Sequence, residues 1–155
     1  MNPITFSCAD TLGISGEEIA QQILDVGNWS DFKGFGVLPG IKAAEFEVKT
    51  PDIVGSRIKV TDTNGSDHIE EIVEWQPDRR LRIHMKDFSP PLSRLATLFE
   101  EVWDFERTDS GIRVIRSFKL HAKSALTRPL LWMISILLKK AIARHLAQLR
   151  SGRSP

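Results

Sequence analysis

Apolar and polar residues alternate along most of the chain, and this period of two predicts β-strands with one face buried. Short turns interrupt the alternation at Asn64-Gly65, Gln76-Pro77-Asp78 and Asp109-Ser110-Gly111, and each turn predicts a hairpin between neighbouring strands. The pattern predicts seven strands, at about residues 4–10, 41–49, 56–62, 67–75, 80–88, 96–107 and 111–121.

Three segments have helical rather than alternating patterns. Ser15 and Glu18 form a capping-box sequence, which predicts a helix from there to about residue 26. The glycine-punctuated stretch 27–36 suggests a turn with a second short helix, and the apolar segment from about Arg128-Pro129 to Arg150 predicts one long helix.

The order of these elements predicts an α+β helix-grip fold. A curved, seven-stranded antiparallel sheet would wrap around the long C-terminal helix, with the two short helices after the first strand. Residues 1–155 show no repeat, linker or low-complexity tract, so we expect one domain, with 151–155 as a disordered tail. A single helix in a concave sheet leaves room between them, and we expect function to lie there.

The strand faces predicted to point inward are apolar with a few charges among them. Glu101 shares its face with Phe99, Trp103 and Phe105, and Arg116 shares its face with Ile112, Val114, Phe118 and Leu120. The hairpin at Asp109-Ser110 makes these strands neighbours, which predicts that Glu101 and Arg116 lie within cross-strand reach. Counting by two along the strand at 67–75 places Glu71 inward, on the face of Ile69, Val73 and Trp75.

Three roles remain open for Glu71, Glu101 and Arg116. They could form interior ion pairs that fix strand register. A carboxyl group desolvated by neighbouring aromatic residues could instead act as a general acid or base, while the arginine holds an anionic or carbonyl oxygen. Between these roles lies a polar handle that orients a ligand without chemistry, which is the role we favour.

The space beside these charges is predicted to be a cavity of at least a few hundred Å³, because bulky inward residues alternate with Val and Ile. The residues expected to contact a ligand all lie on predicted inward faces of the sheet or of the long helix. They are Phe46, Ile58, Val60, Val73, Met85, Phe99, Trp103, Phe118, Ile134 and Leu138.

Composition limits the partners. With 21 basic and 20 acidic residues, the net charge of +1 provides no global field that would attract nucleic acid. The single Cys8 fits a reducing compartment, and no basic-then-apolar signal segment is found at the start, so a cytoplasmic location is expected. No glycine-rich phosphate loop and no metal-ligand pattern are found, so we expect no cofactor and no metal; His68 and Glu70 alone are too few ligands.

The long helix carries more apolar surface than one packed face requires. Its run between Arg128 and Lys139 is too short for a membrane span, which needs about 20 apolar residues. The surplus is expected to pack against the sheet, the segment 29–36 or a second copy in a homodimer. Alternatively, Trp132 and Met133 mark a cavity mouth or a surface that transiently touches a membrane.

Several sequence segments together resemble a known superfamily. They are Asp25-Val26-Gly27-Asn28-Trp29, Leu38-Pro39-Gly40-Ile41, Val54-Gly55-Ser56-Arg57-Ile58, residues 70–81 and Glu101-Val102-Trp103-Asp104-Phe105 with Gly111-Ile112-Arg113-Val114. In this order they resemble the START-like, Bet-v-type (SRPBCC) superfamily, and within it the polyketide cyclase/dehydrase and lipid-transport branch. The resemblance implies a helix-grip fold with a pocket, but it carries no common catalytic set.

Three functions from different classes follow. The first is a carrier or sensor of a small hydrophobic ligand such as a lipid, an isoprenoid or a polyketide-like molecule. The second is a cyclase or dehydratase-type enzyme acting on a polyketide-like substrate. The third is a protein-binding regulator of the co-chaperone type, which a filled cavity and exposed apolar strand faces at Leu98, Val102 and Ile115 would favour.

Overall fold

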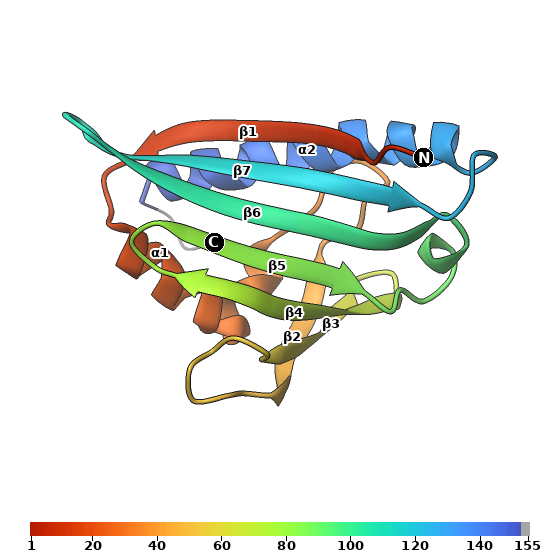
Figure 1. The fold of residues 1–155 in the computed structure, drawn as a ribbon, viewed down its shortest axis with the longest axis horizontal. Helices are drawn as coiled ribbons and strands as arrows, with labels where there is room; N and C mark the ends of the chain where they lie inside the picture. The colour runs from red at the N-terminus through yellow and green to blue at the C-terminus, as the bar shows by residue number, and fades with distance from the viewer. Residues whose placement is uncertain (153–155) are drawn as a thin grey trace.

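The computed structural model describes residues 1–152 and contains one antiparallel sheet of seven strands, in the order β1-β7-β6-β5-β4-β3-β2 (Figure 1). The chain enters at β1, crosses to the other edge at β2, and then returns strand by strand to pair β7 with β1. The strands are β1 (Ile4–Leu12), β2 (Ile41–Val48), β3 (Arg57–Asp62), β4 (Asp67–Gln76), β5 (Arg80–Lys86), β6 (Ala96–Thr108) and β7 (Gly111–Ala122).

Two short helices lie between β1 and β2, namely α1 (Gly16–Leu24) and the 3₁₀ helix η1 (Val26–Asp31). The predicted cap of α1 is present, because Ser15 Oγ accepts a hydrogen bond from the Glu18 amide at 3.1 Å. A further 3₁₀ turn, η2 (Leu92–Arg94), precedes β6, and the chain then forms the long helix α2 (Arg128–Arg150).

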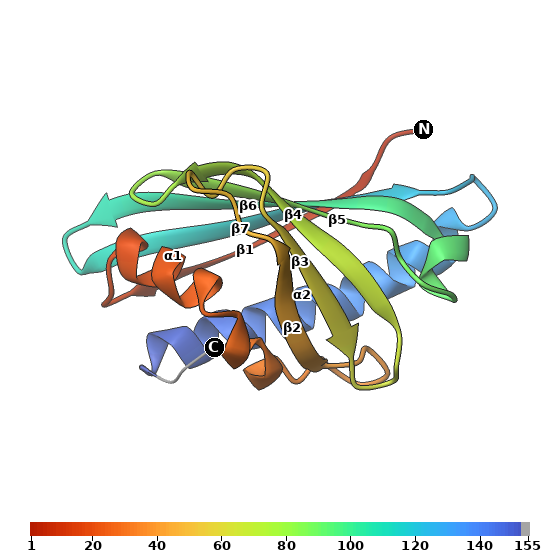
Figure 2. The same cartoon turned by 90° about the horizontal axis from the view of Figure 1, so that it is seen from below.

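Helix α2 lies along the concave side of the sheet, and β2 and β3 curve down beside it (Figure 2). The helix buries one side against the strands through Leu131, Ser135, Ile142, Leu146 and Leu149. The fold is therefore the predicted helix-grip fold. No helix within residues 1–152 is long and apolar enough to cross a bilayer.

The buried apolar residues form two clusters on the concave side. One joins α1, β3 to β6 and the C-terminal end of α2 around Ile58, Ile72 and Leu146. The other joins β1, β6, β7 and the part of α2 between Leu131 and Ile142, around Phe118. Burial of these side chains supplies the main favourable term for folding.

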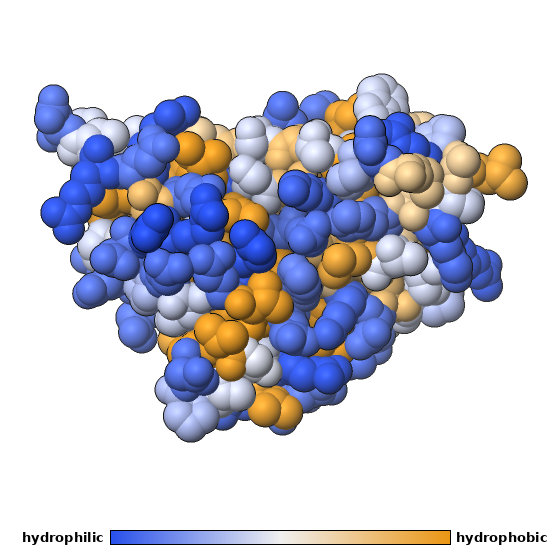
Figure 3. Space-filling model, viewed as in Figure 1, coloured by the Kyte–Doolittle hydropathy of each residue, from blue (hydrophilic) through white to orange (hydrophobic). Residues whose placement is uncertain are grey.

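The opposite, convex face of the sheet is largely hydrophilic (Figure 3). Cross-strand polar contacts lie on it, including the ion pair of Arg80 with Asp104 at 2.7 Å and the hydrogen bond between His121 and Glu100 at 2.7 Å. Such partly exposed pairs add little stability, but they identify this side as the solvent face.

The tail expected over 151–155 follows directly on α2. The Ser151 amide donates to the Ala147 carbonyl at 3.1 Å, so Ser151 caps the helix. Residues 153–155 lie outside the described residues.

Candidate functional site

A cavity of about 380 Å³ lies between the concave face of the sheet and α2. This volume is within the usual range of small-molecule pockets. Trp103 and Phe118 both line it, as predicted. The expected cavity between sheet and helix is therefore present.

The cavity reaches the surface where three loops meet α2. Among its lining residues, Val37, Asn64 and Pro91 are exposed, with Val37 89% accessible to solvent. They belong to the η1–β2 segment, the β3–β4 turn and the β5–η2 segment, and Leu137 of α2 lines the cavity with them. These loops therefore form its mouth.

Six of the ten residues predicted to contact a ligand line the cavity: Met85, Phe99, Trp103, Phe118, Ile134 and Leu138. Their role in binding stays a prediction. Ile58 and Val60 are completely buried in the core, and Phe46 packs against the same core cluster, so these three support the wall without forming it. Val73 also does not line the cavity, for a different reason.

A β-bulge in β4 makes the predicted inward direction of Glu71 and Val73 wrong. Ile72 pairs with Ile83 and Glu74 with the next residue, Arg82, so Val73 is an extra residue opposite β5. Trp75 packs against the core as expected, but the extra residue reverses the faces of all positions before it. Glu71 therefore forms an ion pair with Lys86 away from the cavity.

The same reversal places Glu70 and His68 on the cavity wall. Their side chains are largely buried, and His68 Nε2 lies 2.9 Å from Glu70 Oε2. Burial by itself lowers the pKa of His68, but the hydrogen bond and charge of Glu70, helped by Asp62 and Asp67, outweigh it and raise the pKa above its ordinary value. Glu70 therefore favours the protonated form of His68.

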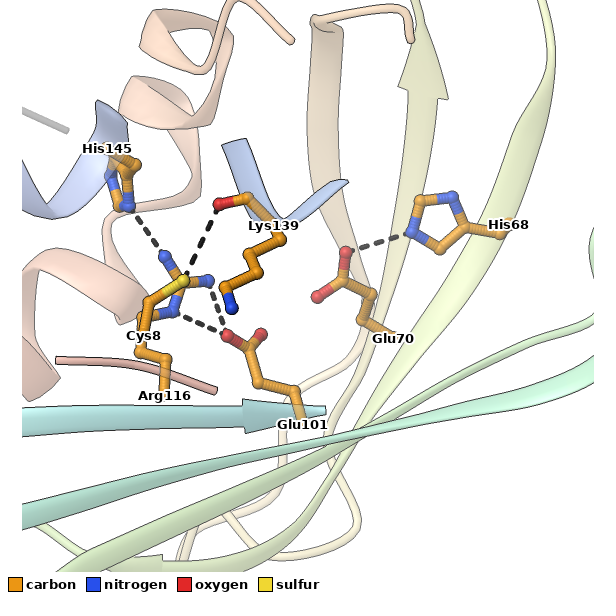
Figure 4. A network of polar contacts seen from close by, with 7 residues as sticks. All are labelled: Cys8, His68, Glu70, Glu101, Arg116, Lys139 and His145. Atoms are coloured by element: carbon orange, nitrogen blue, oxygen red, sulfur yellow. Dashed lines mark hydrogen bonds and ion pairs between the residues drawn. The ribbon is translucent and has the colours of Figure 1, made fainter. Parts of the chain in front are cut away.

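Glu101 and Arg116 form the predicted inward ion pair on neighbouring strands (Figure 4). Arg116 lies opposite Trp103, and Glu101 lies opposite Phe118, so the pair is diagonal. Arg116 Nε donates to Glu101 Oε2 at 2.7 Å, and Nη2 contacts the same oxygen. The guanidinium carbon also lies 4.1 Å from the centre of the Trp103 ring, so the arginine is held by charge and by a cation–π contact.

The two members of this pair are among the most buried charged side chains of the chain, with Glu101 2% and Arg116 6% exposed. Burial raises the pKa of the Glu101 carboxyl above its ordinary value, while the positive charge of Arg116 acts in the opposite direction. Oε2 accepts both guanidinium contacts, which fits a carboxylate paired with a guanidinium.

His145 completes this polar group from α2, and the sequence did not indicate it. Its Nδ1 lies 2.8 Å from Arg116 Nη1 (Figure 4). Burial, with a smaller contribution from the Arg116 charge, lowers the pKa of His145 to about 3, so the ring is neutral at ordinary pH.

Cys8 lies on the other side of Arg116 but offers no reactive nucleophile. Burial raises the pKa of its thiol, although the charges of Lys139 and Arg116 act against the rise. Its Sγ contacts the Lys139 carbonyl at 3.5 Å (Figure 4). Among residues 1–152, no group of three or more His, Cys, Asp or Glu is placed to hold a metal.

The helix η1 and the segment that joins it to β2 form a part of the wall that strand periodicity could not reveal. Trp29 of η1 lines the cavity, as do Phe32, Leu38 and Pro39 of the joining segment. Gly34 makes its tight turn with φ of +73°, and a Cβ there would lie 2.2 Å from the Leu38 carbonyl oxygen. The aromatic residues among glycines were the available sequence signal for this wall.

The first half of α2 is not buried all round. Leu130, Trp132 and Met133 are 50%, 54% and 59% exposed. Farther along α2, Lys140 Nζ lies 5.5 Å and Arg144 Cζ lies 5.8 Å from the centre of the Phe35 ring. These cation–π contacts connect α2 to the loop at the mouth.

The comparisons with solved structures show what fold this is. The protein TTHA0849 from Thermus thermophilus aligns over 96% of this chain and 95% of its own, with a TM-score of 0.70 and 14% identity. Major latex-like protein 151 from Panax ginseng aligns over 94% and 98%, with a TM-score of 0.66 and 14% identity. A START superfamily protein from Mycobacterium smegmatis also aligns over 94% and 98%, with a TM-score of 0.66 and 12% identity.

No protein-family model matches the chain, and no curated protein matches it by sequence. At these low identities, the structural matches establish the START-like, Bet-v-type fold but not a shared ligand or activity.

Proposed function

We propose that this protein binds one small, mostly apolar molecule in its internal cavity and acts as a carrier or sensor. The observation that carries the proposal is the cavity of about 380 Å³, whose wall joins apolar residues to inward-facing polar pairs. Such a combination is typical of ligand pockets, where apolar contacts give affinity and a few polar groups fix orientation. A lipid, an isoprenoid or a polyketide-like molecule has the required character.

Native mass spectrometry of the purified protein tests this directly, because a bound ligand of high affinity should copurify. Binding of the neutral fluorescent probe N-phenyl-1-naphthylamine provides a second test. Ile134→Trp places a larger ring where Ile134 lines the cavity, and it should abolish probe binding. Ile136→Trp, two residues away on the exposed side of α2, is the matched control and should leave binding unchanged. Equal binding by wild type and Ile134→Trp would contradict the proposal.

One observation supports an enzyme of the cyclase or dehydratase type as the second candidate. His68 and Glu70 form a histidine–carboxylate pair on the cavity wall, and such a pair can take up and return a proton. Glu101 and Arg116 would then hold a substrate oxygen. Conversion of a copurified molecule that stops in Glu70→Gln would favour this candidate over a carrier.

The co-chaperone alternative has less support. It required a filled cavity and exposed strand faces, whereas the cavity is open and Leu98, Val102 and Ile115 are each only partly exposed. A protein partner is therefore not part of the proposal.

The exposed apolar side of α2 supports a transient contact with membranes during ligand exchange. Trp132 and Met133 are more than half exposed, and α2 contains basic residues but no Asp or Glu. An apolar stripe on a basic helix suits an anionic lipid surface.

Flotation with vesicles of phosphatidylserine and phosphatidylcholine tests this contact. Wild-type protein should float with them, and Trp132→Ser with Met133→Ser should not. If the wild type instead forms a dimer without lipid and the same two changes abolish that dimer, the surface is a homodimer interface and the membrane proposal fails.

We also propose that residues 1–155 form one domain and that the protein is located in the cytoplasm. The free thiol of Cys8 is compatible with a reducing compartment. Fractionation of cells that express the natural protein would test the location.

A further inference from the structure

The charged groups on the cavity wall indicate which class of ligand the cavity binds. This inference rests on the ligand-binding function proposed above. Among residues 1–152, the ionisable groups that line the cavity are the side chains of Asp62, His68, Glu70, Glu101, Arg116 and His145. A ligand that enters the cavity meets these charges in a largely apolar surrounding, where an unpaired charge is costly.

Each cation on the wall already has a carboxylate partner. Arg116 contacts Glu101 through Nε and Nη2, and His68 lies 2.9 Å from Glu70. An incoming anion would have to compete with these carboxylates for the same cations. It would also be desolvated next to two negative charges.

The third basic side chain cannot serve as a cation at all. An arginine nitrogen only donates hydrogen bonds, so His145 Nδ1 must be the unprotonated acceptor of the bond from Arg116 Nη1. The neutral ring then carries its proton on Nε2. His145 is therefore a neutral donor and not an anion site.

The carboxyl groups on the wall outnumber the cations. The wall holds three carboxyl groups, those of Asp62, Glu70 and Glu101, and only two side chains that can be cations, Arg116 and His68. Without Asp62, each of these two side chains still has one carboxyl group beside it. Neither count favours an anionic ligand.

One buried donor on the wall lacks a partner. Trp103 is 3% exposed and lines the cavity, and its Nε1–H makes no hydrogen bond within the described residues. The indole lies close enough to Glu101 to favour the ionised carboxylate, but not in hydrogen-bond geometry. Glu101 has a second oxygen, Oε1, which takes no part in the contacts with Arg116 (Figure 4).

We infer that the cavity selects an apolar molecule with an uncharged hydroxyl group, an alcohol or a phenol, and rejects the corresponding carboxylate. A hydroxyl group accepts one hydrogen bond and donates another, which matches the free donor of Trp103 and the free acceptor of Glu101. It brings no charge into a wall whose cations are already paired.

The test uses three molecules that share one alkyl chain, namely 1-decanol, decanoate and decylammonium, in competition with N-phenyl-1-naphthylamine at neutral pH. We expect 1-decanol to displace the probe at a concentration at least about tenfold lower than decanoate, because the anion must be desolvated without a free cation. Decanoate binding as tightly as 1-decanol, or decylammonium binding more tightly, would overturn the inference.

Glu101→Gln should increase the affinity for decanoate, and a variant with a merely damaged fold would not show such an increase. The change keeps the shape but leaves the Arg116 charge without a carboxylate, so decanoate should bind better than to wild type by about tenfold or more. Glu71→Gln, a glutamate on the opposite face of the sheet, is the matched control and should not change the ratio. Unchanged decanoate affinity in a folded Glu101→Gln protein would also overturn the inference.

The ligand-binding function and the preference for a hydroxyl group can be disproved separately. If wild-type protein binds neither the probe nor any of the three molecules, the ligand-binding function itself is wrong. If it binds the probe but prefers an ion to 1-decanol, only the inference about the hydroxyl group is wrong.

Discussion

Arg116 donates a hydrogen bond from Nη1 to Nδ1 of His145 across 2.8 Å, and this contact joins β7 to α2 inside the cavity. It also determines the state of the histidine, because a ring that accepts from an arginine cannot be protonated at that nitrogen. The long helix is thus attached to the sheet by a neutral histidine beside a buried cation.

This contact makes folding stability depend on pH. The pKa of His145 is lowered from 6.5 to about 3, so below pH 6.5 the unfolded chain binds a proton at this residue that the folded protein does not. Stability from this group is therefore complete above pH 6.5 and should fall by about 1.4 kcal/mol for each pH unit below it, until the folded pKa is reached.

Urea unfolding of wild type and His145→Gln at several pH values measures this effect. Glutamine can accept from Arg116 but does not titrate, so the difference in unfolding free energy between the two proteins isolates the histidine. A difference that does not change between neutral pH and pH 4.5 would contradict the assignment.

His68 should show the opposite behaviour, although it lines the same cavity. Its pKa is raised by Glu70 in spite of burial, so its stabilising contribution is complete below pH 6.5 and is lost as the pH rises through the folded pKa.

In an NMR titration, the His68 ring should change protonation above pH 6.5, while the His145 ring should stay neutral to below pH 5. Glu70→Gln should move the His68 midpoint downward, and Glu71→Gln should leave it in place. A His68 midpoint at or below 6.5 in wild type would show that Glu70 is not its partner.

The buried ion pair predicts a large and coupled effect on stability. Arg116→Met leaves Glu101 as an uncompensated buried charge and should cost about 3–5 kcal/mol, whereas adding Glu101→Leu should recover much of that loss. Arg113→Met on the same strand is the control, because Arg113 and Glu106 are about half exposed and 3.6 Å apart, and its cost should stay below about 1 kcal/mol. Urea unfolding of the four proteins of the cycle gives the coupling energy, and a value near zero would contradict the contact.

Strand alternation was sufficient to predict the fold and the Glu101–Arg116 pair. The hairpin at Asp109-Ser110 fixed the relation of β6 to β7, and both strands keep an unbroken period of two through Glu101 and Arg116. The positions of the strands and of α2 followed from turn residues and apolar runs for the same reason.

The same reasoning failed at β4 because one added residue reverses a strand. Nothing in the local pattern distinguishes Val73 as a bulge, since Val is an ordinary strand residue, so counting back from Trp75 selected Glu71 instead of Glu70. His145 was missed for another reason. Its contact with Arg116 spans 29 residues and depends on how α2 is rotated against the sheet, which a single helix pattern does not specify.

The last prediction uses this reversal to separate chemistry from binding. Glu70 lines the cavity and Glu71 does not, although they are adjacent in the chain, so Glu70→Gln and Glu71→Gln are a matched pair. If the protein is a carrier, Glu70→Gln should change only the dissociation constant of a copurified ligand, and no ligand should be consumed by any variant. If the His68–Glu70 pair is catalytic, turnover should fall by about a hundredfold or more in Glu70→Gln with little change in affinity. In both cases Glu71→Gln should behave as wild type.

Mass spectrometry of the ligand before and after incubation measures consumption, and titration calorimetry measures affinity. We expect the carrier result, because the one serine on the cavity wall, Ser66, is hydrogen-bonded to Asp62 and not to a histidine; a new product that is absent with Glu70→Gln would contradict it.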